Sequence, residues 1–289
     1  MSFSPAHVPF PKDPDIRQFF VEAAEIGSHV TWIVEWVSIP KYEILKVVRD
    51  MTARAGMKFH VHLSPIALFG GRRAPAIPAH VGGTSFADSV VRNAYVSEVV
   101  NLAALKADYL GPATEVNFLA LNSPEFDAFA TLAKQACRAV KEKYPSQTVT
   151  ISFQWDVMRS QKNFNLIDRF DDAMDVISFT SYPDAFGVPA SIPRDYYSSL
   201  REAFPNRRIG FSEIGWSSAP PGNEAQQAEF YARLPEMTHG INPEFVTLAL
   251  LHDVKVFSGN LARLNYVGIR TWDDAPKPAW DAVLRMPGI

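Results

Sequence analysis

Short runs of apolar and β-branched residues alternate along this chain with longer segments in which apolar residues recur every three or four positions. The short runs predict seven strands, at 29–35, 57–63, 108–115, 148–153, 176–179, 208–212 and 245–250. The longer segments predict helices, for example at 14–26, 39–55, 87–107 and 223–234. Repeated alternation of strand and helix is typical of a parallel α/β fold.

An eighth strand follows from this alternation. The helix predicted at 14–26 needs a strand before it, and only residues 1–10 can supply one. Eight βα units within 289 residues predict a (β/α)8 barrel that forms one domain over residues 1–289. A doubly wound open sheet is the alternative, but no Gly-x-Gly-x-x-Gly follows any strand, which argues against dinucleotide binding.

Composition and charge narrow the possible partners. Hydrophobic residues make up 47% and charged residues 20%, with a formal net charge of -3 and no dense basic cluster. We therefore expect no nucleic-acid partner, and the lack of an apolar run of 18 residues predicts no membrane partner. Cys137 is the only cysteine, so no intrachain disulfide can form. We expect a monomer, and we favour export with a removed signal peptide over a cytoplasmic location.

The candidate chemistry lies where strands end, because (β/α)8 barrels carry their active sites at the carboxyl ends of the strands. With residues 1–10 counted as the first strand, the second to eighth strands end in the following candidates: Glu35 and Trp36; His60 and His62; Thr114, Glu115 and Asn117; Gln154, Trp155 and Asp156; Tyr182; Glu213 and Trp216; His252 and Asp253. Trp272 is a further candidate for the cleft.

Two of these residues, Glu115 and Glu213, end the fourth and seventh strands, which predicts a carboxyl pair across the barrel mouth. Glycoside cleavage needs such a pair. One carboxyl protonates the leaving oxygen, and the other attacks the anomeric carbon or activates water. Trp and Tyr side chains at neighbouring strand ends offer apolar faces for sugar rings.

Four segments then resemble glycoside hydrolase clan A: LGPATEVN around Glu115, RRIGFSEIGWSS around Glu213, TSYPDAF around Tyr182, and VGIRTWDDAPKPAWDAVL near the end. The endo-galactanase-like and cellulase-like branches are members of that clan. The resemblance implies a retaining glycosidase that needs no cofactor or metal and acts on a carbohydrate substrate. Glu115 would be the general acid/base, Glu213 the nucleophile, and Tyr182 the tyrosine beside the nucleophile. It also implies carboxyl groups about 5–5.5 Å apart, rather than the roughly 6.5–9.5 Å of an inverting enzyme.

One position departs from the clan pattern. The clan usually has Asn directly before the acid/base glutamate, where it binds the sugar 2-hydroxyl, and this chain has Thr114. Thr cannot match the reach of an amide, so we expect Asn117 to be the residue that could compensate. The identity of the sugar, its linkage, and endo or exo action stay open.

Two other functions remain as alternatives. A barrel of this kind could bind carbohydrate without cleaving it. His60 and His62 lie two apart on a strand and therefore point to one face, a pattern that suits a metal-dependent hydrolase or contact with sugar hydroxyls.

The Gly- and Pro-rich segment 64–86 is expected to form part of the cleft wall, because long loops in compact domains are commonly functional.

Overall fold

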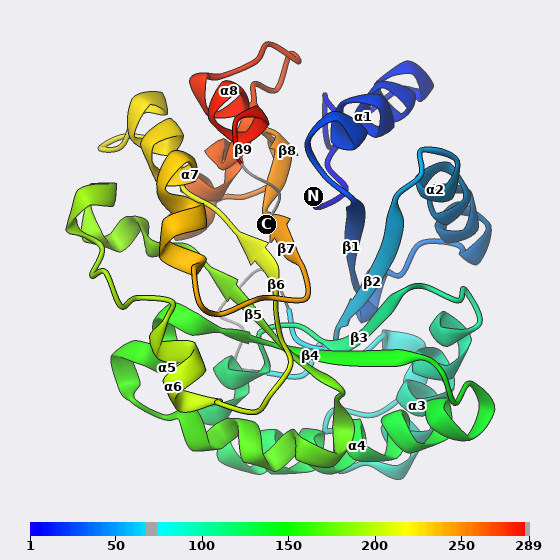
Figure 1. Cartoon of the computed structure of the whole chain (residues 1–289). Helices are drawn as coiled ribbons and strands as arrows, with labels where there is room; N and C mark the ends of the chain where they lie inside the picture. Colours follow the sequence, from blue (N-terminus) through cyan, green and yellow to red (C-terminus); the bar gives the residue numbers. More distant parts are fainter. Residues whose placement is uncertain (68–73, 287–289) are drawn as a thin grey trace. The chain divides into compact units, whose positions relative to one another are not determined.

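The computed structural model of this chain describes residues 1–67 and 74–286 (Figure 1). Within these residues, seven strands form a sheet in sequence order: β1 (His29–Glu35), β2 (Lys58–Ser64), β3 (Tyr109–Ala113), β4 (Thr148–Gln154), β5 (Val176–Ser181), β6 (Ile209–Ile214) and β7 (Val246–Leu248). Two further strands, β8 (Leu250–His252) and β9 (Gly268–Arg270), pair with each other. The seven strands predicted from clear apolar runs are therefore confirmed, and each keeps its place along the chain.

Helices separate most of these strands, as the alternating pattern predicted. They are α1 (Asp13–Ile26), α2 (Tyr42–Arg54), α3 (Ser89–Ala103), α4 (Ser123–Lys143), α5 (Trp155–Gln161), α6 (Ser199–Ala203), α7 (Glu224–Thr238) and α8 (Pro278–Leu284). The chain divides into two compact units, which we describe separately. Unit 1 comprises Met1–Val30, Ala55–Met57 and Ser181–Ile289, and unit 2 comprises Thr31–Arg54 and Lys58–Thr180. A single catalytic domain over 1–289 stays a prediction.

Unit 2 is built on the parallel strands β2 to β5. Register places Val61, Leu110 and Val149 side by side, so they share one face of the sheet. Helices α3 and α4 pack against β3 and against each other, and Figure 1 shows them together beside β3 and β4. Phe153 in β4 contacts Phe170 of the 3₁₀ segment η4 (Phe164–Ala173), with ring centroids 5.6 Å apart. The core of this unit therefore lies between the strands and these helices.

Unit 1 carries the parallel pairs β6–β7 and β8–β9. Helices α7 and α8 pack on each other, and α8 also contacts α1 and β9 (Figure 1). Phe230 of α7 is fully buried and packs on Trp216, which follows β6. The apolar face of α7 thus covers the segment that leads out of β6.

The short first strand expected within residues 1–10 is reduced to a single bridge. Only Ser2 forms a β-bridge, in which its backbone N–H donates to the Leu248 carbonyl at 3.0 Å. The Met1 amino group donates to the His29 carbonyl at 3.0 Å, and the Ser4 hydroxyl accepts from the Leu251 N–H at 2.8 Å. Prolines at positions 5, 9 and 11 have no N–H to donate, so this segment cannot form a continuous ladder.

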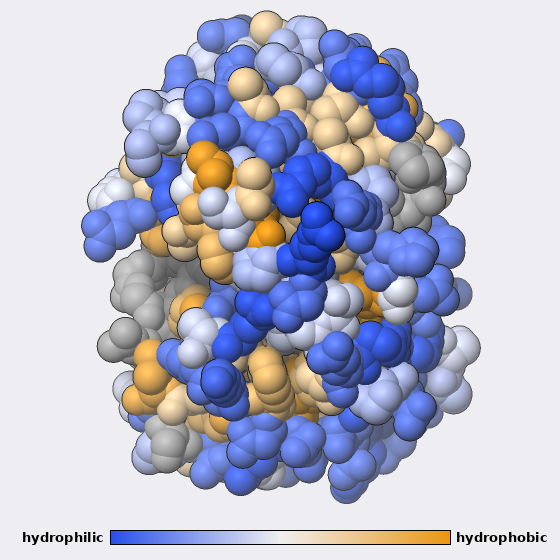
Figure 2. All heavy atoms as spheres, turned by 60° about the vertical axis from the view of Figure 1, so that its left-hand side comes forward, coloured by the Kyte–Doolittle hydropathy of each residue, from blue (hydrophilic) through white to orange (hydrophobic). Residues whose placement is uncertain are grey.

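The surface is largely hydrophilic on the face that Figure 2 turns toward the reader, with apolar side chains scattered between polar ones. The most exposed large apolar residue among those described is Phe10, at 82%. Single exposed apolar side chains of this kind are normal for a folded protein. No helix in the described ranges has the length and apolarity that a membrane span requires.

The contact at Gly268 gives a first testable prediction. A Cβ built on this residue would lie 2.3 Å from the backbone nitrogen of Asp253 and 2.3 Å from the backbone carbon of His252. Backbone atoms cannot move aside as a flexible side chain can. We therefore expect Gly268→Ala to lower the free energy of unfolding by roughly 1–3 kcal/mol or more, measured by chemical denaturation.

Gly27→Ala is the matched control. A Cβ there meets only the Ala23 carbonyl oxygen, at an ordinary 3.6 Å, and the backbone is extended, with φ -160°. Its effect should stay within about 0.5 kcal/mol. Equal effects of the two substitutions would show that the close contact at Gly268 does not constrain the fold.

Candidate active site

Glu115 follows β3 in a backbone conformation that is rare for a non-glycine residue. Its φ of 53° and ψ of 39° lie in the left-handed region, where such a residue costs about 1–2 kcal/mol. Its side chain is buried, and Oε1 accepts a hydrogen bond from the Thr180 hydroxyl at 2.6 Å. Local strain at a buried carboxylate next to a strand end is typical of a functional residue.

Asn117 and Gln154 form a hydrogen-bonded support beside Glu115. Asn117 Oδ1 accepts from the Gln154 backbone N–H at 2.7 Å, and its Nδ2 donates to the Gln154 carbonyl at 3.3 Å. The Gln154 side chain caps α5 through Val157 N at 2.7 Å and donates to Asp156 Oδ2 at 2.5 Å. All three predicted residues, Asn117, Gln154 and Asp156, therefore hold the end of β4. Their contact with a substrate stays a prediction.

Thr114, His60 and His62 are buried in unit 2. Among the described residues, the Thr114 hydroxyl makes no hydrogen bond, so it does not position Glu115 through its side chain. Burial lowers the pKa of His62 to about 4, and the His60 ring packs on Tyr109 with centroids 4.5 Å apart. In the described ranges, one cluster has three or more possible metal ligands, and it consists of Glu22, His252 and Asp274. His60 and His62 are not part of that cluster.

Glu213, near the end of β6 in unit 1, is partly buried, and its Oε2 accepts a hydrogen bond from the Tyr182 hydroxyl at 2.9 Å. Gly215 makes room for that tyrosine. A Cβ at Gly215 would lie 3.1 Å from Tyr182 Cε1 and 2.9 Å from Ala249 Cβ, and the Gly215 N–H donates to the Ser181 carbonyl at 3.0 Å. Leu261 and other apolar residues of the segment 257–267 pack in the same cluster as Tyr182 and Ala249.

Three predicted sugar-stacking tryptophans are core residues instead. Trp36 packs on Tyr95, Trp155 stacks on Phe164, and Trp216 packs on Phe230, with ring centroids 4.9–5.5 Å apart. All three are at most 3% exposed, so their ring faces are taken by protein. The apolar flanking sequence could not distinguish a cleft aromatic from a core aromatic.

Trp272 and Glu35 keep some exposure. Trp272 donates from Nε1 to the Val8 carbonyl at 2.9 Å, and Lys255 Nζ lies 3.2 Å from its ring centroid, which covers one face of the indole. Glu35 Oε2 accepts from the Ser38 hydroxyl at 3.3 Å. Their predicted contact with sugar stays a prediction.

His252 is part of a buried charge cluster. Its Nδ1 lies 2.9 Å from the Ser4 carbonyl oxygen, and Nε2 lies 2.8 Å from Asp274 Oδ1 and 3.2 Å from Glu22 Oε2. Every partner can only accept, so the geometry assigns a proton to both ring nitrogens. Burial opposes this charge, yet the hydrogen bonds to Glu22, Asp274 and Ser4 raise the pKa of His252 above its ordinary value.

Asp253 forms a second buried ion pair. Its Oδ1 accepts from Lys277 Nζ at 2.7 Å, and the same ammonium donates to the Gly268 carbonyl at 2.9 Å and to the Ser218 hydroxyl at 3.1 Å. Burial raises the pKa of Asp253 to about 6, while Lys277 acts in the opposite direction. His252 and Asp253, which we predicted as substrate contacts, therefore join chain segments within unit 1.

Two residues at these sites were missed by the sequence analysis. Thr180 holds Glu115, and Gly215 makes room for Tyr182. Both lie inside the quoted segments TSYPDAF and RRIGFSEIGWSS, but nothing in the residue pattern separates them from their neighbours. Their roles depend on side-chain contacts that only the fold creates.

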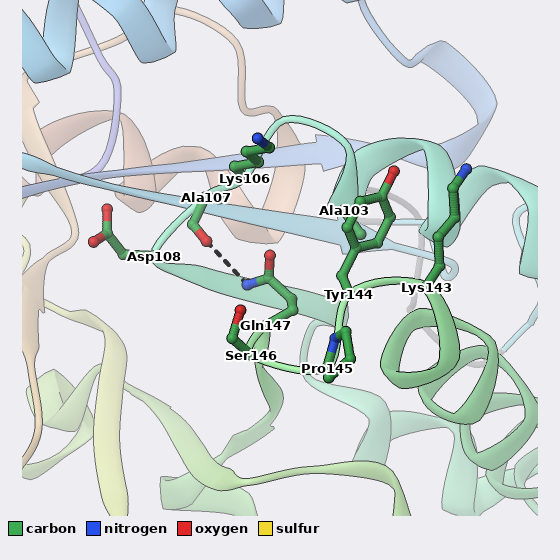
Figure 3. A pocket seen from close by; sticks show the side chains of 9 residues that line it. All are labelled: Ala103, Lys106, Ala107, Asp108, Lys143, Tyr144, Pro145, Ser146 and Gln147. Carbon is green, nitrogen blue, oxygen red and sulfur yellow. Dashed lines mark hydrogen bonds between the residues drawn. The ribbon is translucent and has the colours of Figure 1, made fainter.

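One pocket of about 580 Å³ lies away from these residues (Figure 3). Lys106, Lys143 and Tyr144 line it, and Gln147 Nε2 donates to the Ala107 carbonyl at 2.9 Å. These residues precede β3 and β4, whereas Glu115 and Gln154 stand at the carboxyl ends of those strands. The pocket is therefore not part of the candidate site.

Comparisons with known proteins identify structural relatives. No family model matches the sequence, and no curated protein matches it. Among solved structures, the exo-β-1,4-mannosidase Op5Man5 from Opitutaceae bacterium strain TAV5 matches with a TM-score of 0.77 and 14% identity over 98% of this chain. A calcium-binding mutant of β-glucuronidase 2 from Bacteroides uniformis matches with a TM-score of 0.68 and 12% identity over 98% of this chain.

The GH113 β-mannanase AaManA from Alicyclobacillus acidocaldarius matches with a TM-score of 0.64 and 17% identity over 99% of this chain and 95% of its own. This chain spans 57% of Op5Man5 and 34% of the β-glucuronidase. These relatives are TIM-barrel glycosidases, so the likeness confirms the predicted (β/α)8 fold class.

The charge state of His252 gives a second prediction. The pKa of His252 is higher in the folded protein than in the unfolded chain, where a histidine has a pKa of about 6.5. Protonated His252 therefore stabilises the fold fully below pH 6.5. This stabilisation is lost as the pH rises through the pKa of the folded protein. We expect this contribution, measured as the difference in the free energy of unfolding between the protein and His252→Gln, to decrease as pH rises above about 6.5. His252→Gln should remove this contribution and lower stability near pH 6, because Glu22 and Asp274 then keep only Arg270 as a cationic partner.

The measurement is chemical denaturation at several pH values. His239→Gln is the control, since His239 is exposed in the same unit and should leave the pH profile unchanged. If His252→Gln leaves the dependence of the unfolding free energy on pH unaltered, the assignment of a proton to both ring nitrogens of His252 is wrong.

Proposed function

We propose that this chain is a retaining glycoside hydrolase that cleaves β-linked sugars, with Glu213 as the nucleophile and Glu115 as the general acid/base. One observation carries the proposal. Each glutamate accepts a hydrogen bond from a hydroxyl group, and the two donors, Thr180 and Tyr182, are separated by one residue of the chain. Thr180 thus orients Glu115 within unit 2, and Tyr182 orients Glu213 within unit 1.

The proposed role of Glu213 follows from its contact with Tyr182. Tyr182 donates to Oε2 at 2.9 Å, which fixes the carboxylate rotamer and favours its ionised form. Glu213 then attacks the anomeric carbon and forms a glycosyl-enzyme bond, while the glycosidic C–O bond breaks. The phenol stabilises the carboxylate again when water releases the sugar.

The proposed role of Glu115 is proton transfer to and from the leaving group. Because Oε1 accepts from Thr180 at 2.6 Å, the proton of the acid form resides on Oε2. Glu115 passes this proton to the glycosidic oxygen in the first step. As a carboxylate it then removes a proton from the water that attacks the intermediate.

The substrate class rests on the named structural relatives. The names of the three proteins reported above describe a β-1,4-mannosidase, a β-glucuronidase and a β-mannanase, all of which refer to β-linked sugars. We extend only that β-linkage to this chain. Thr114 stands where clan A usually has Asn, so the contact with the sugar 2-hydroxyl is expected to differ from the clan pattern.

Substitution of the two glutamates tests this proposal. Glu213→Ala should abolish turnover of β-glycosides. Glu115→Ala should slow natural substrates greatly but spare the first step for aryl glycosides with very good leaving groups. For these substrates, added azide should restore the rate, because it attacks the intermediate without a general base. Steady-state rates on a panel of aryl glycosides and polysaccharides provide the measurement.

Glu229→Gln is the control for these substitutions. Glu229 lies on α7, where it is 3.8 Å from Arg233, and its replacement should leave kcat unchanged. Wild-type activity in Glu213→Ala would contradict the proposal. A product whose anomeric configuration is inverted, measured by NMR, would instead assign Glu213 as a general base.

The contact between Tyr182 and Glu213 gives a further prediction. Tyr182→Phe removes a hydrogen bond to a charged group, which is worth about 1.5–3 kcal/mol, so kcat should fall roughly 10- to 100-fold. Gly215→Ala should also lower kcat, because its methyl group would displace the Tyr182 ring. Tyr42→Phe removes a comparable hydrogen bond, from Tyr42 to Glu98 in unit 2, and should not change kcat. Equal kcat values in all three variants would remove Tyr182 from the proposed mechanism.

A further inference from the structure

One face of the unit 2 sheet carries polar side chains that are completely buried. We call it the hydroxyl face and define it by His62 in β2, Thr150 and Ser152 in β4, and Ser178 and Thr180 in β5, all of which are 0% exposed. The residues between them, such as Ile151 and Phe179, are apolar and lie on the opposite face. Buried polar groups are unfavourable unless they form hydrogen bonds.

Three residues of the hydroxyl face have polar atoms without a hydrogen-bond partner among the described protein groups. These atoms are both ring nitrogens of His62, the hydroxyl oxygen of Thr150 and the hydroxyl oxygen of Ser178. Fully buried polar atoms of this kind are rare, and in most structures ordered water satisfies them. Their occurrence on three strands of one face points to a shared set of partners.

Strand register places His62 and Thr150 on the same face of the sheet, with β3 between them. His62 pairs with Gly111 in β3. Between the pairs Leu110–Val149 and Ala113–Ile151, β3 has two residues and β4 has one, so Gly111 and Pro112 both oppose Thr150. A Cβ on Gly111 would lie only 2.4 Å from His62 Nδ1. The imidazole therefore covers the position that has no side chain, on the strand that separates His62 from Thr150.

The hydroxyl face continues from Thr150 to the candidate acid/base. Ser152 pairs with Ser178, and Gln154 pairs with Thr180. Residues two apart on a strand lie roughly 6.4–6.8 Å apart on one face. That spacing is too long for one hydrogen bond of about 2.7–3.2 Å but suits two bonds through a single water molecule. The last hydroxyl, on Thr180, donates to Glu115.

We propose that the hydroxyl face binds a chain of ordered water molecules that starts at His62, passes Thr150 and Ser178, and ends at Thr180. Each hydroxyl can donate and accept, and a neutral imidazole offers one N–H and one acceptor nitrogen, which matches the two-way bonding of water. Burial keeps His62 neutral at ordinary pH, since it lowers the pKa to about 4.

The water chain also explains the direction of the hydrogen bond between Thr180 and Glu115. A hydroxyl has one proton, and a water molecule that donates to Thr180 Oγ1 leaves that proton for Glu115 Oε1. This last step rests on the proposed function of Glu115, whereas the water chain itself does not. Thr150 and Ser178 are thus positioning residues that act on Glu115 through Thr180.

The sign of a stability change tests the water chain. Thr150→Val and Ser178→Ala each remove a hydroxyl and leave an apolar side chain of equal or smaller size. If water binds these hydroxyls, both variants lose hydrogen bonds, and the denaturation midpoint should fall. If the hydroxyls are dry and unsatisfied, Thr150→Val should raise the midpoint, which would overturn the proposal.

Thr52→Val is the matched control for these variants. The Thr52 hydroxyl is equally buried in unit 2 but donates to the Val48 carbonyl at 2.8 Å, so its loss gives the shift expected for a satisfied hydroxyl. A crystal structure at high resolution should show water within hydrogen-bond distance of Thr150 Oγ1 and a ring nitrogen of His62. If these atoms contact only apolar groups and the map shows no water density beside them, the proposal is wrong.

A second readout concerns the acid/base step. If the chain proves to be a glycosidase, Ser178→Ala should move the alkaline limb of the kcat/KM pH profile, whereas Thr52→Val should not. A moved midpoint with an unmoved pH profile would retain the water chain and reject its link to Glu115. If the chain shows no glycosidase activity, the denaturation and crystallographic results still decide whether the water is bound.

Discussion

The hydrogen bonds from Thr180 and Tyr182 are the interactions on which the candidate chemistry depends. A carboxylate at a strand end has free rotation about its side-chain bonds, and a donor hydroxyl selects one orientation. Thr180 selects it for Glu115 at 2.6 Å, and Tyr182 selects it for Glu213 at 2.9 Å. Between these donors, Ser181 is fixed from two sides, since its hydroxyl lies 2.9 Å from that of Tyr197 and its carbonyl accepts from the Gly215 N–H. Within unit 1, these contacts fix the backbone that leads into Tyr182.

Backbone geometry supplies the second condition. Glu115 meets Thr180 while its own φ is positive, an arrangement that a regular strand ending would not produce. Tyr182 meets Glu213 with its ring against Gly215, where a Cβ would lie 3.1 Å from the ring. In both cases an unfavourable or restrictive local feature stands beside the glutamate, and the surrounding packing maintains it. The proposed functional positions are therefore where local preference and global fold disagree.

The sequence predicted the order of strands and helices well, because apolar periodicity reports directly which faces are buried. It placed Glu115 directly after a strand and Glu213 near the end of one for the same reason. It failed for Trp155 and Trp216, because a tryptophan after a strand has the same local pattern whether it packs on Phe164 or faces solvent. The short strand expected within residues 1–10 is only a bridge at Ser2, because prolines remove the donors of a ladder. Contacts between residues distant in sequence, such as Thr180 with Glu115, leave no trace in local pattern.

The two units satisfy their buried polar groups in different ways. In unit 1, buried charged side chains form ion pairs with side chains of the opposite charge. Lys277 pairs with Asp253, and His252 pairs with Glu22 and Asp274. Such pairs need both partners in the protein, so they link the chain ends to β8 and β9 rigidly. Unit 2 buries neutral hydroxyl groups and an imidazole whose pKa of about 4 keeps it uncharged. Neutral groups tolerate water as a partner, because water can donate and accept as each site requires. A neutral sheet face beside Glu115 adds no fixed charge that would bias its protonation, which suits the acid/base role that we propose for this residue.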